Sequence, residues 1–450
     1  MSFPRYPKYK DSGVEWLGEV PEHWAVKRLK RICRVFPSNV DKKSIEGEAA
    51  VLLCNYTDVY YNDRIVADME FMPATATDDQ IAKFTLRAGD TIITKDSETA
   101  DDIAVAAYVP HDLPGVVCGY HLSMVRPQGG IHGAFVKRLF DSAYAKSCFA
   151  VRANGLTRVG LSQYELDNVD MPVPPPIEQV AITTFLDRET AKIDALIAEQ
   201  QRLIELLQEK RQAVISHAVT KGLNPDAPMK DSRVEWLGEV PEHWGVKMLK
   251  YLSPQITVGI VVEPSKHYVT EGVPALRSLN VTGDGIVMNN VVFISPEANE
   301  LHRKSRLHAG DIVAVRSGQP GTCAIIPPEL DGCNCVDLII IRKPEECTSH
   351  FLRWYLSSDF AKVQFGSGAE GAIQQHFNVS TASQLLAAVP PLSEQDAIVA
   401  FVDDAAHTLD TLRDEAQRAI ILLQERRSAL VSAAVTGQID VRGLAGSEAA

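Results

Sequence analysis

Residues that could do chemistry are few and isolated in this chain. Asp41, Lys42 and Lys43 form an Asp-x-Lys triplet of the kind that nucleases use, but they lie in a charged, turn-like stretch with no later counterpart. Cys333 and Cys335 are the close cysteine pair, and no second pair or histidine cluster completes a zinc site, so buried reduced thiols are the alternative. The chain lacks the Gly-x4-Gly-Lys-[Ser/Thr] phosphate loop and the Asn-Pro-Pro-[Tyr/Phe] run of adenine methyltransferases. We therefore expect no catalytic residue, metal ion or cofactor in this chain.

Two histidines stand before tryptophans at duplicated positions, His23 before Trp24 and His243 before Trp244. A catalytic role would need a nucleophile and an orienting group at a matching spacing, and the sequence supplies neither. The flanking apolar residues favour a packed clamp that anchors the start of a domain.

An internal repeat sets the architecture. Residues 10–30 recur at 230–250 with 18 of 21 positions identical, and Glu178-Gln179 after a Pro-Pro pair matches Glu394-Gln395. The copies diverge between these blocks and keep only landmarks such as Leu86–Asp90 over Leu307–Asp311. The pattern indicates one framework that carries two different specificities. Free drift after an old duplication is the alternative.

The second repeated block predicts long helices over 177–218 and 392–434. Neither contains glycine or proline, and each ends near a glycine, as helices commonly do. Apolar residues recur every seven positions, which is typical of a coiled coil, and Leu196, Leu203, Leu412 and Ala419 are expected at the second contact position. A single amphipathic helix on its own domain is the alternative for each. The predicted contact residues, here called the seam, are Leu186, Ile193, Leu207, Val214, Val402, Leu409, Leu423 and Leu430.

The two diverged segments, 25–170 and 245–385, are predicted to be mixed α and β domains. Strand-like runs lie at 89–94, 103–108, 310–315 and 336–341, and helical runs follow at 135–149 and 351–365. We therefore predict an α+β fold with two pseudo-symmetric domains of mixed helix and sheet.

Composition leaves the class of ligand open. The chain has 450 residues and a net charge of −13, but residues 1–176 and 230–389 each carry only three more acidic than basic residues. A near-neutral domain can still present one basic face, so charge neither supports nor excludes DNA binding. No apolar run approaches the ~18–20 residues that cross a bilayer, and the start has no secretion signal. We expect a soluble, cytoplasmic protein with no membrane contact.

The two repeated motifs together resemble the specificity subunit of type I restriction-modification systems. They are Val14-Glu-Trp-Leu-Gly-Glu-Val-Pro-Glu-His-Trp24 and the helix that begins Pro-Pro-Ile-Glu-Gln, and both occur twice in the same order. The resemblance implies a non-catalytic subunit of a complex that methylates adenine and cuts DNA with ATP. Its partners would be double-stranded DNA with a bipartite target, two modification subunits and, through the complex, restriction subunits. S-adenosylmethionine, ATP and magnesium would then belong to the partner subunits.

The same resemblance assigns the domains. Residues 1–175 would form target-recognition domain 1 and 223–389 target-recognition domain 2, while 438–450 would be a flexible tail. Two conserved helices, 176–222 and 390–437, would pair as an antiparallel coiled coil that separates the domains and docks the modification subunits.

Base-reading residues are expected in the loop after the Gly-Asp strand and in the polar segment before the conserved helix. Arginine suits guanine and glutamine suits adenine by paired hydrogen bonds in the major groove, whereas the acidic run after Lys95 departs from a basic loop. A solvated loop contact is the alternative for each residue. The predicted DNA-binding residues are Lys95, Ser97, Arg152, Asn154, Arg158, Arg316, Ser317, Gln319, Gln374, Gln375 and His376.

Two other function classes stay open at this point. A self-sufficient nuclease would need a site that the motifs do not reveal, and the lone chain with magnesium and plasmid would then cut. A scaffold that binds proteins through its duplicated domains would be indifferent to DNA sequence.

Overall fold

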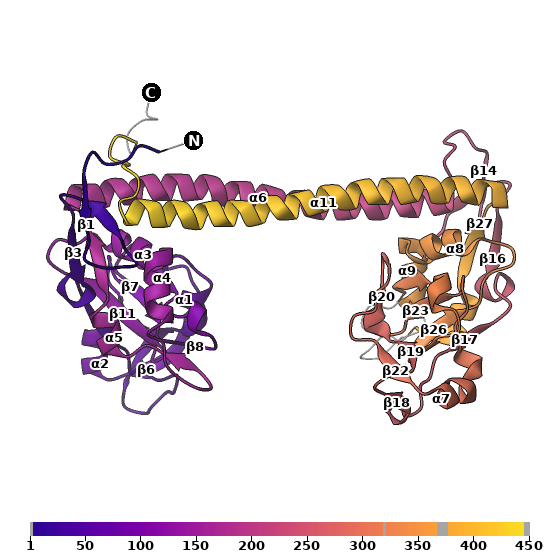
Figure 1. Ribbon diagram of the computed structural model, residues 1–450, viewed down its shortest axis with the longest axis horizontal. Coiled ribbons are helices and arrows are strands. Elements are labelled where there is room, and N and C mark those ends of the chain that lie inside the picture. Colours follow the sequence, from indigo (N-terminus) through magenta and orange to yellow (C-terminus); the bar gives the residue numbers. More distant parts are fainter. Residues whose placement is uncertain (1–2, 318–320, 367–376, 445–450) are drawn as a thin grey trace. The chain divides into compact units, whose positions relative to one another are not determined.

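The computed structural model describes residues 3–317, 321–366 and 377–444 (Figure 1). The chain divides into two compact units. Unit 1 comprises Met1–Gln200 and Arg418–Ala450, and unit 2 comprises Gln201–Gln417. Each unit therefore contains one diverged segment together with a part of each long helix.

The two long helices are α6 (Pro176–Lys221) and α11 (Leu392–Val435). Each follows prolines, which disfavour helix before them, and ends before a glycine with a φ of +77°, at Gly222 and Gly437. In unit 1, Asp194 of α6 pairs with Arg427 of α11; in unit 2, Arg211 of α6 pairs with Asp410 of α11. A step of 17 residues forward on α6 thus corresponds to 17 back on α11, so the helices pair antiparallel in both units.

Burial along the helices corrects the predicted seam. Six of the eight predicted seam residues are buried, and Val214 and Leu423 are half-buried. The second contact position is wrong, because Leu196, Leu203 and Leu412 are 42–45% exposed and Ala419 is half-buried. That position lies four rather than three residues after the first, and its occupants include Ile197, Ile204, Ala406 and Ile420. The sequence hid this choice because Leu196-Ile197 and Leu203-Ile204 place apolar residues at both spacings.

The diverged segment of unit 1 is built on a four-stranded sheet of order β4-β11-β7-β9 and a three-stranded sheet of order β10-β5-β6. The pair β3–β13 joins the start of the segment to its end. The bounds are β1 (Tyr9–Asp11), β2 (Glu19–Pro21), β3 (Ala25–Arg28), β4 (Cys33–Pro37), β5 (Ala49–Cys54), β6 (Met72–Ala76), β7 (Thr91–Thr94), β8 (Asp96–Ser97), β9 (Ala106–Tyr108), β10 (Val116–Cys118), β11 (Leu122–Pro127), β12 (Val159–Gly160), β13 (Asp170–Val173), α1 (Tyr56–Tyr60), α2 (Asp78–Phe84), α3 (Gly133–Asp141), α4 (Ala143–Ala150) and α5 (Gln163–Asp167).

Unit 2 repeats this plan with sheets of order β17-β26-β23-β24 and β18-β22-β19-β25, and β16–β27 joins the two ends of its segment. The bounds are β14 (Met229–Asp231), β15 (Glu239–Pro241), β16 (Gly245–Met248), β17 (Ile256–Val258), β18 (Tyr268–Val269), β19 (Val273–Leu276), β20 (Val281–Thr282), β21 (Gly285–Ile286), β22 (Val292–Ile294), β23 (Ile312–Val315), β24 (Cys323–Ile325), β25 (Asn334–Cys335), β26 (Leu338–Ile341), β27 (Leu386–Val389), α7 (Pro296–Leu301), α8 (Ser349–Leu356), α9 (Asp359–Gly366) and α10 (Val379–Gln384).

The shared Ala-Gly-Asp landmark shapes the turn into the central strand of each sheet. Buried Asp90 accepts two 2.7 Å hydrogen bonds from Arg126 of β11, and Asp311 accepts one of 2.6 Å from Arg342 after β26. These charge-assisted bonds tie the turn to the neighbouring strand. The predicted strands at 89–94 and 310–315 are confirmed, but they begin two residues late because the Gly-Asp pair forms the turn.

The helical runs predicted at 135–149 and 351–365 are each two helices. Ser142 has an extended backbone, and its Oγ accepts a 3.2 Å hydrogen bond from the Ala145 amide, so it caps α4 and ends α3. Ser358 accepts in the same way from Ala361 at 3.3 Å. In unit 1, α3 lies beneath the long helices (Figure 1). Phe135 of α3 belongs to the same hydrophobic core as Phe185 of α6 and Leu430 of α11.

The segment after α11 is ordered against the N-terminal segment. The Asp440 amide donates a 2.7 Å hydrogen bond to the Pro4 carbonyl, the Tyr9 hydroxyl donates to the Gly437 carbonyl at 3.0 Å, and Val441 is fully buried. The expected flexible tail is therefore wrong for residues 438–444, while 445–450 lie outside the described residues. In unit 1, the N-terminal segment and the segment after α11 thus pack against each other. In unit 2, the corresponding place is taken by the continuous chain that runs from the end of α6 to β14.

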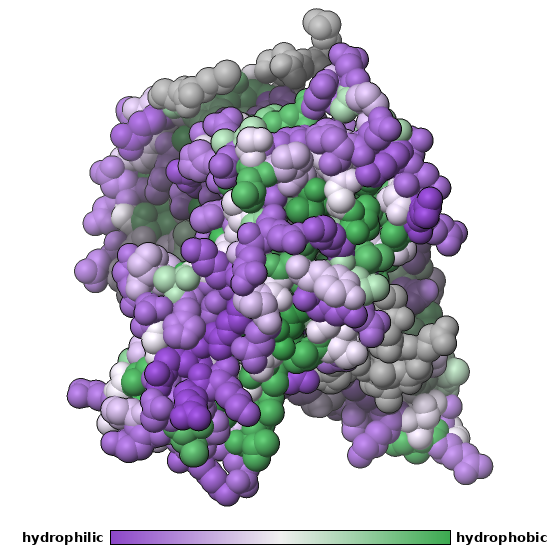
Figure 2. All heavy atoms as spheres, turned by 90° about the vertical axis from the view of Figure 1, so that its right-hand side faces the viewer, coloured by the Kyte–Doolittle hydropathy of each residue, from purple (hydrophilic) through white to green (hydrophobic). Residues whose placement is uncertain are grey.

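The eight cysteines are all buried and unpaired. Figure 2 shows apolar side chains between polar ones on the surface that it presents. Exposed apolar residues of unit 2 include Tyr251, Val262 and Leu301, and scattered exposure of this kind is ordinary. No helix within the described ranges combines the length and apolar character that crossing a membrane requires.

Candidate nucleic-acid interface

Strand pairing in unit 1 brings the two predicted reading segments together. β8, which follows the Gly-Asp strand, pairs antiparallel with β12, so Ser97 lies opposite Val159 and Asp96 opposite Gly160. The Leu161 amide also donates a 3.1 Å hydrogen bond to the Lys95 carbonyl. Residues more than sixty positions apart in the sequence thus form one surface edge.

A tight loop projects from this edge. Asn154 and Gly160 exchange backbone hydrogen bonds of 3.0 and 2.9 Å, which closes the loop at its base. Gly155 has a φ of +150°, and a Cβ there would lie 1.9 Å from the Arg158 carbonyl oxygen. Only glycine fits this position. Asn154, Leu156 and Arg158 are exposed on the loop.

The acidic run that follows Lys95 is partly neutralised. Asp96 forms an ion pair with Arg158 at 2.8 Å, and its carboxylate lies 2.9 Å from His121 Nδ1. Asp102 accepts hydrogen bonds from the Tyr60 hydroxyl at 2.7 Å and from Ser97 at 3.4 Å. The bond to Asp102 raises the pKa of Tyr60 to about 12, so the hydroxyl remains a donor at neutral pH.

The structure separates the predicted residues of unit 1 by what they can reach. Arg158 is half exposed and Asn154 is exposed, so both can meet a ligand. Ser97 is buried, and Arg152 donates to the Cys148 carbonyl at the end of α4 at 2.9 Å, so these two side chains support the loop. Lys95 is half-buried, with its Nζ 5.9 Å from the centre of the Tyr120 ring.

In unit 2 the equivalent edge carries different residues. Arg316 lies five residues after the Ala-Gly-Asp motif, as Lys95 does in unit 1. It forms an ion pair with Asp337. Asp337 stands just before β26, as His121 stands just before β11. The Phe377 amide donates a 3.1 Å hydrogen bond to the Arg316 carbonyl. Ser317 follows as a bend. The predicted residues that lie outside the described ranges are Gln319, Gln374, Gln375 and His376.

Sequence reasoning missed the aromatic residues beside these edges. On α1, Tyr56 and Tyr60 stack with ring centres 5.4 Å apart, and Tyr61 is 76% exposed. Their four-residue spacing on a polar helix could have drawn attention to them. In unit 2, His267 and His302 approach to 3.1 Å near a cavity of about 640 Å³ between residues 257–262 and 300–305. The Asp337 amide donates to the Ile260 carbonyl, so this cavity adjoins the Arg316 edge.

The duplicated histidines and tryptophans form a clamp around one carboxylate in each unit. Glu178 accepts hydrogen bonds from Trp24 Nε1 at 2.9 Å and from the Tyr6 hydroxyl at 3.2 Å, and His23 Nε2 lies 2.6 Å away. Glu394 holds Trp244 and His243 at 3.1 and 2.8 Å. Both glutamates stand in the first turn of a long helix, where the helix dipole favours a negative charge. The clamp anchors the framework, and within the described ranges no hydrogen bond or ion pair joins its histidines to a candidate reading residue.

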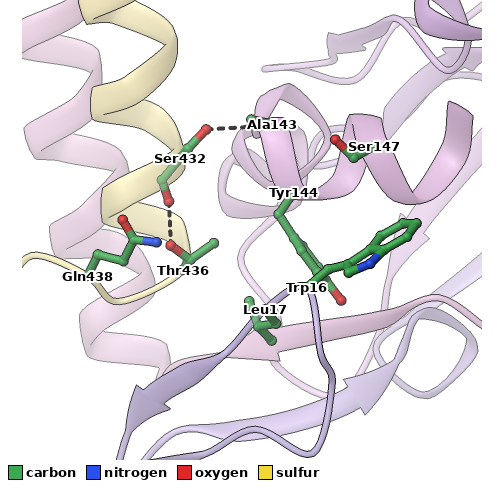
Figure 3. Close-up of a pocket in the computed structure, with 8 residues that line it drawn as sticks. All are labelled: Trp16, Leu17, Ala143, Tyr144, Ser147, Ser432, Thr436 and Gln438. Atoms are coloured by element: carbon green, nitrogen blue, oxygen red, sulfur yellow. Dashed lines mark hydrogen bonds between the residues drawn. The ribbon is translucent and has the colours of Figure 1, made fainter.

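The long helices also hold the short helices of each unit. The Ala143 amide at the start of α4 donates a 2.8 Å hydrogen bond to Ser432 of α11 (Figure 3), and the Asp359 amide at the start of α9 donates to Ser216 of α6 at 3.0 Å. Beside Ser432 lies a cavity of about 520 Å³ that Trp16, Tyr144 and Thr436 help to line. Trp16 belongs to the nearly identical block, so this cavity is part of the framework.

Comparison with known proteins places this arrangement. No protein-family model matches the chain. Over 436 residues it is 24% identical to a putative type I restriction enzyme MjaX specificity subunit of Methanocaldococcus jannaschii, covering 95% of this chain and 96% of the relative. It is 22% identical over 446 residues to the EcoKI specificity subunit of Escherichia coli K12, covering 94% and 90%. The chain is related over most of its length to type I restriction enzyme specificity subunits.

Solved structures agree with this kinship in fold. A chain from a type I R-M system superposes with a TM-score of 0.67 at 17% identity, covering 92% of this chain and 98% of that chain. The HsdS subunit from Thermoanaerobacter tengcongensis gives 0.53 at 16% identity, covering 93% and 98%. The predicted α+β fold with long paired helices is confirmed. Within this specificity-subunit fold, the differing residues Lys95 and Arg316 occupy equivalent positions on a common frame.

Proposed function

We propose that this chain gives a type I restriction-modification complex its DNA sequence specificity, with each recognition domain reading one half of a bipartite double-stranded target. One observation carries the proposal. A duplicated framework, clamped by Glu178 and Glu394, presents chemically different residues at the same edge of each domain. A duplicated domain that read one repeated sequence would have kept the same residues on both edges.

The reading edges have the chemistry that base recognition needs. Arg158 and Asn154 lie exposed on the loop that the Asn154–Gly160 hydrogen bonds close in unit 1, and Arg316 stands at the strand end in unit 2. Arginine can donate two hydrogen bonds to guanine, and asparagine can pair with adenine in the same bidentate way. The ion pairs of Arg158 with Asp96 and of Arg316 with Asp337 hold these side chains in place before DNA arrives. Lys95, Ser317 and the residues at 319 and 374–376 complete the proposed set.

The outer faces of the long helices supply a platform for the partner subunits. Large apolar side chains stay 42–64% exposed there, where a solvated helix would carry polar ones, and 196 and 412 as well as 206 and 422 are equivalent positions. An apolar stripe on an outer helix face suits the apolar face of another helix. These residues are Leu196, Ile421 and Leu422 in unit 1, and Leu203, Leu206 and Leu412 in unit 2.

Two equivalent stripes fit two modification subunits, with restriction subunits added through the complex. In this proposal the chain itself performs no catalysis, and S-adenosylmethionine, ATP and Mg²⁺ are used by the partner subunits. Among the described residues, no group of three or more metal-ligating side chains converges.

An exchange of one domain tests the proposal. Residues 25–170 are replaced with the matching segment of a related subunit, the complex is assembled with its modification subunits, and methylated adenines are mapped. One half of the bipartite target should change while the other half and the gap stay the same. A simultaneous change of both halves, or methylation indifferent to sequence, would reject the assignment of one half-site to each domain. Purified chain that alone cuts or methylates plasmid would reject the non-catalytic role.

A further inference from the structure

Two arginines stand where the helix seam should be apolar. Arg427 of α11 and Arg211 of α6 occupy the second contact position, one heptad after Ile420 and Ile204, and the two arginines are equivalent residues of the repeat. Each side chain is about three-quarters buried. A polar residue in a coiled-coil seam lowers stability and commonly fixes a geometry. The contacts of these arginines show which geometry that is.

Arg427 joins three elements of unit 1. Its Nε donates to Asp194 of α6 at 2.9 Å, and its Nη2 donates to Asp63 at 3.0 Å. Asp63 lies in the loop after α1, within the diverged segment, and accepts a second hydrogen bond from the buried Lys137 of α3 at 2.8 Å. The arginine therefore connects both long helices to the recognition domain.

Charge holds this junction together. Burial alone would raise the pKa of Asp63, but the attraction and hydrogen bond of Lys137, together with Arg427, outweigh it and lower the pKa to about 2. Asp63 therefore stays ionised at neutral pH. The planar guanidinium fork fixes direction as well as distance, which a lysine cannot do.

Unit 2 repeats this junction, but its arginine makes a weaker contact with the recognition domain. Arg211 donates to Asp410 of α11 at 3.1 Å, and its Nη2 lies 4.0 Å from Asp284, which is the counterpart of Asp63. Asp284 is 80% exposed on its side chain, compared with 58% for Asp63. The arginine thus bonds to the other long helix in both units. Its contact with the recognition domain is closer in unit 1 than in unit 2.

We infer that Arg427 and Arg211 are positioning residues that fix the orientation of each recognition domain on the helix pair, and so restrict the gap between half-sites that the complex accepts. The inference rests on the proposed function. Stability alone does not account for the arrangement, because partly exposed ion pairs contribute only about 0–1 kcal/mol. The helices already pack through Ile193 and Leu430 in unit 1 and through Val219 and Val402 in unit 2. The arginine adds direction to this packing.

The test measures gap tolerance in the assembled complex. Wild-type complex first defines the target, and methylation rates are then measured on duplexes whose gap is one base pair shorter, equal or one longer. Arg427→Gln and Asp63→Asn should raise the rate at the wrong gaps, relative to the correct gap, by about fivefold, roughly what one partly buried ion pair is worth. The half-site sequences should stay the same. Asp284→Asn should have a smaller effect, because Asp284 lies farther from Arg211 than Asp63 lies from Arg427.

Arg202→Gln is the matched control, since Arg202 pairs with Glu205 on the exposed surface of the same helix α6 at 2.8 Å. It should leave the gap profile unchanged. A normal gap profile in both Arg427→Gln and Asp63→Asn would overturn the inference, and so would loss of assembly in both, because the residues would then serve binding. Wild-type complex that methylates no bipartite site would instead reject the proposed function and leave no gap to measure.

Discussion

Replacing Glu178 with alanine should destabilise its clamp more than the same replacement of Glu394. Glu178 is 9% exposed and holds Trp24, Tyr6 and His23, whereas Glu394 is 27% exposed and holds Trp244 and His243. The two residues are equivalent in the repeat, so each serves as the internal reference for the other.

The magnitudes follow from burial and hydrogen bonding. Removing Glu178 leaves the fully buried Trp24 indole N–H without an acceptor, and removing one partner from a buried charged network costs about 3–5 kcal/mol. Water can reach the position of the more exposed Glu394, so its loss should cost about 1–3 kcal/mol, the range for one hydrogen bond to a charged group. Glu178→Gln keeps a hydrogen-bond acceptor, so its cost in stability should lie between those of Glu178→Ala and Glu394→Ala.

Hydrogen exchange followed by mass spectrometry resolves the two sites in one molecule. The Trp24 and Trp244 amides donate equivalent 2.9 Å bonds to Pro21 and Pro241, so peptides covering 19–31 and 239–251 report each clamp. Exchange should accelerate about tenfold for each 1.4 kcal/mol lost, and only in the unit that carries the substitution. Equal acceleration by both alanine variants, or a larger effect of Glu394→Ala, would refute the reasoning from burial.

Four further outcomes are expected. Arg158→Ala should weaken discrimination at one or two positions of one half-site by about 1–3 kcal/mol, measured as methylation rates on single-base target variants, with the other half unchanged. Gly155→Ala should disorder the same loop and slow methylation in that assay, because a Cβ there meets the Arg158 carbonyl. Leu422→Asp should preserve the fold but weaken co-purification with the modification subunit, whereas Leu207→Asp, at a buried seam position, should also lower the melting temperature. Because the pKa of Asp63 is lowered to about 2, its ionised form stabilises unit 1 above pH 4, and the stability difference from Asp63→Asn should shrink in urea titrations as the pH falls from about 4 to 2.

The framework could be predicted because its evidence is local and duplicated. The long helices were expected at 177–218 and 392–434 and lie at Pro176–Lys221 and Leu392–Val435, since uninterrupted helical periodicity between a proline pair and a glycine marks both ends. The break at Ser142 was missed because the apolar spacing continues through it, and only the serine cap ends the helix.

The site was harder to predict because its geometry depends on long-range contacts. Ser97 and Arg152 had suitable side chains, but strand pairing buries the first and the end of α4 occupies the second. The acidic residues after Lys95 looked unsuited to DNA because the partners of Asp96 and Asp102 lie far away in the sequence, at Arg158 and Tyr60. Such pairs follow from the topology of the sheet, which periodicity does not reveal.

The strand pairs β3–β13 and β16–β27 have a consequence for how such a chain can vary. Each pair closes its diverged segment into a loop, and the paired ends Ala25 and Val173 are 148 residues apart, whereas Gly245 and Val389 are 144 apart. The entropy of closing a long loop grows only with the logarithm of its length, so adding or removing a few residues inside it changes the free energy of folding very little. The strand pair holds the two ends of the segment together whatever the length between them, so a change of length inside the segment does not displace the helices. Insertions and deletions within the segment can therefore accumulate while the register of α6 against α11 stays fixed.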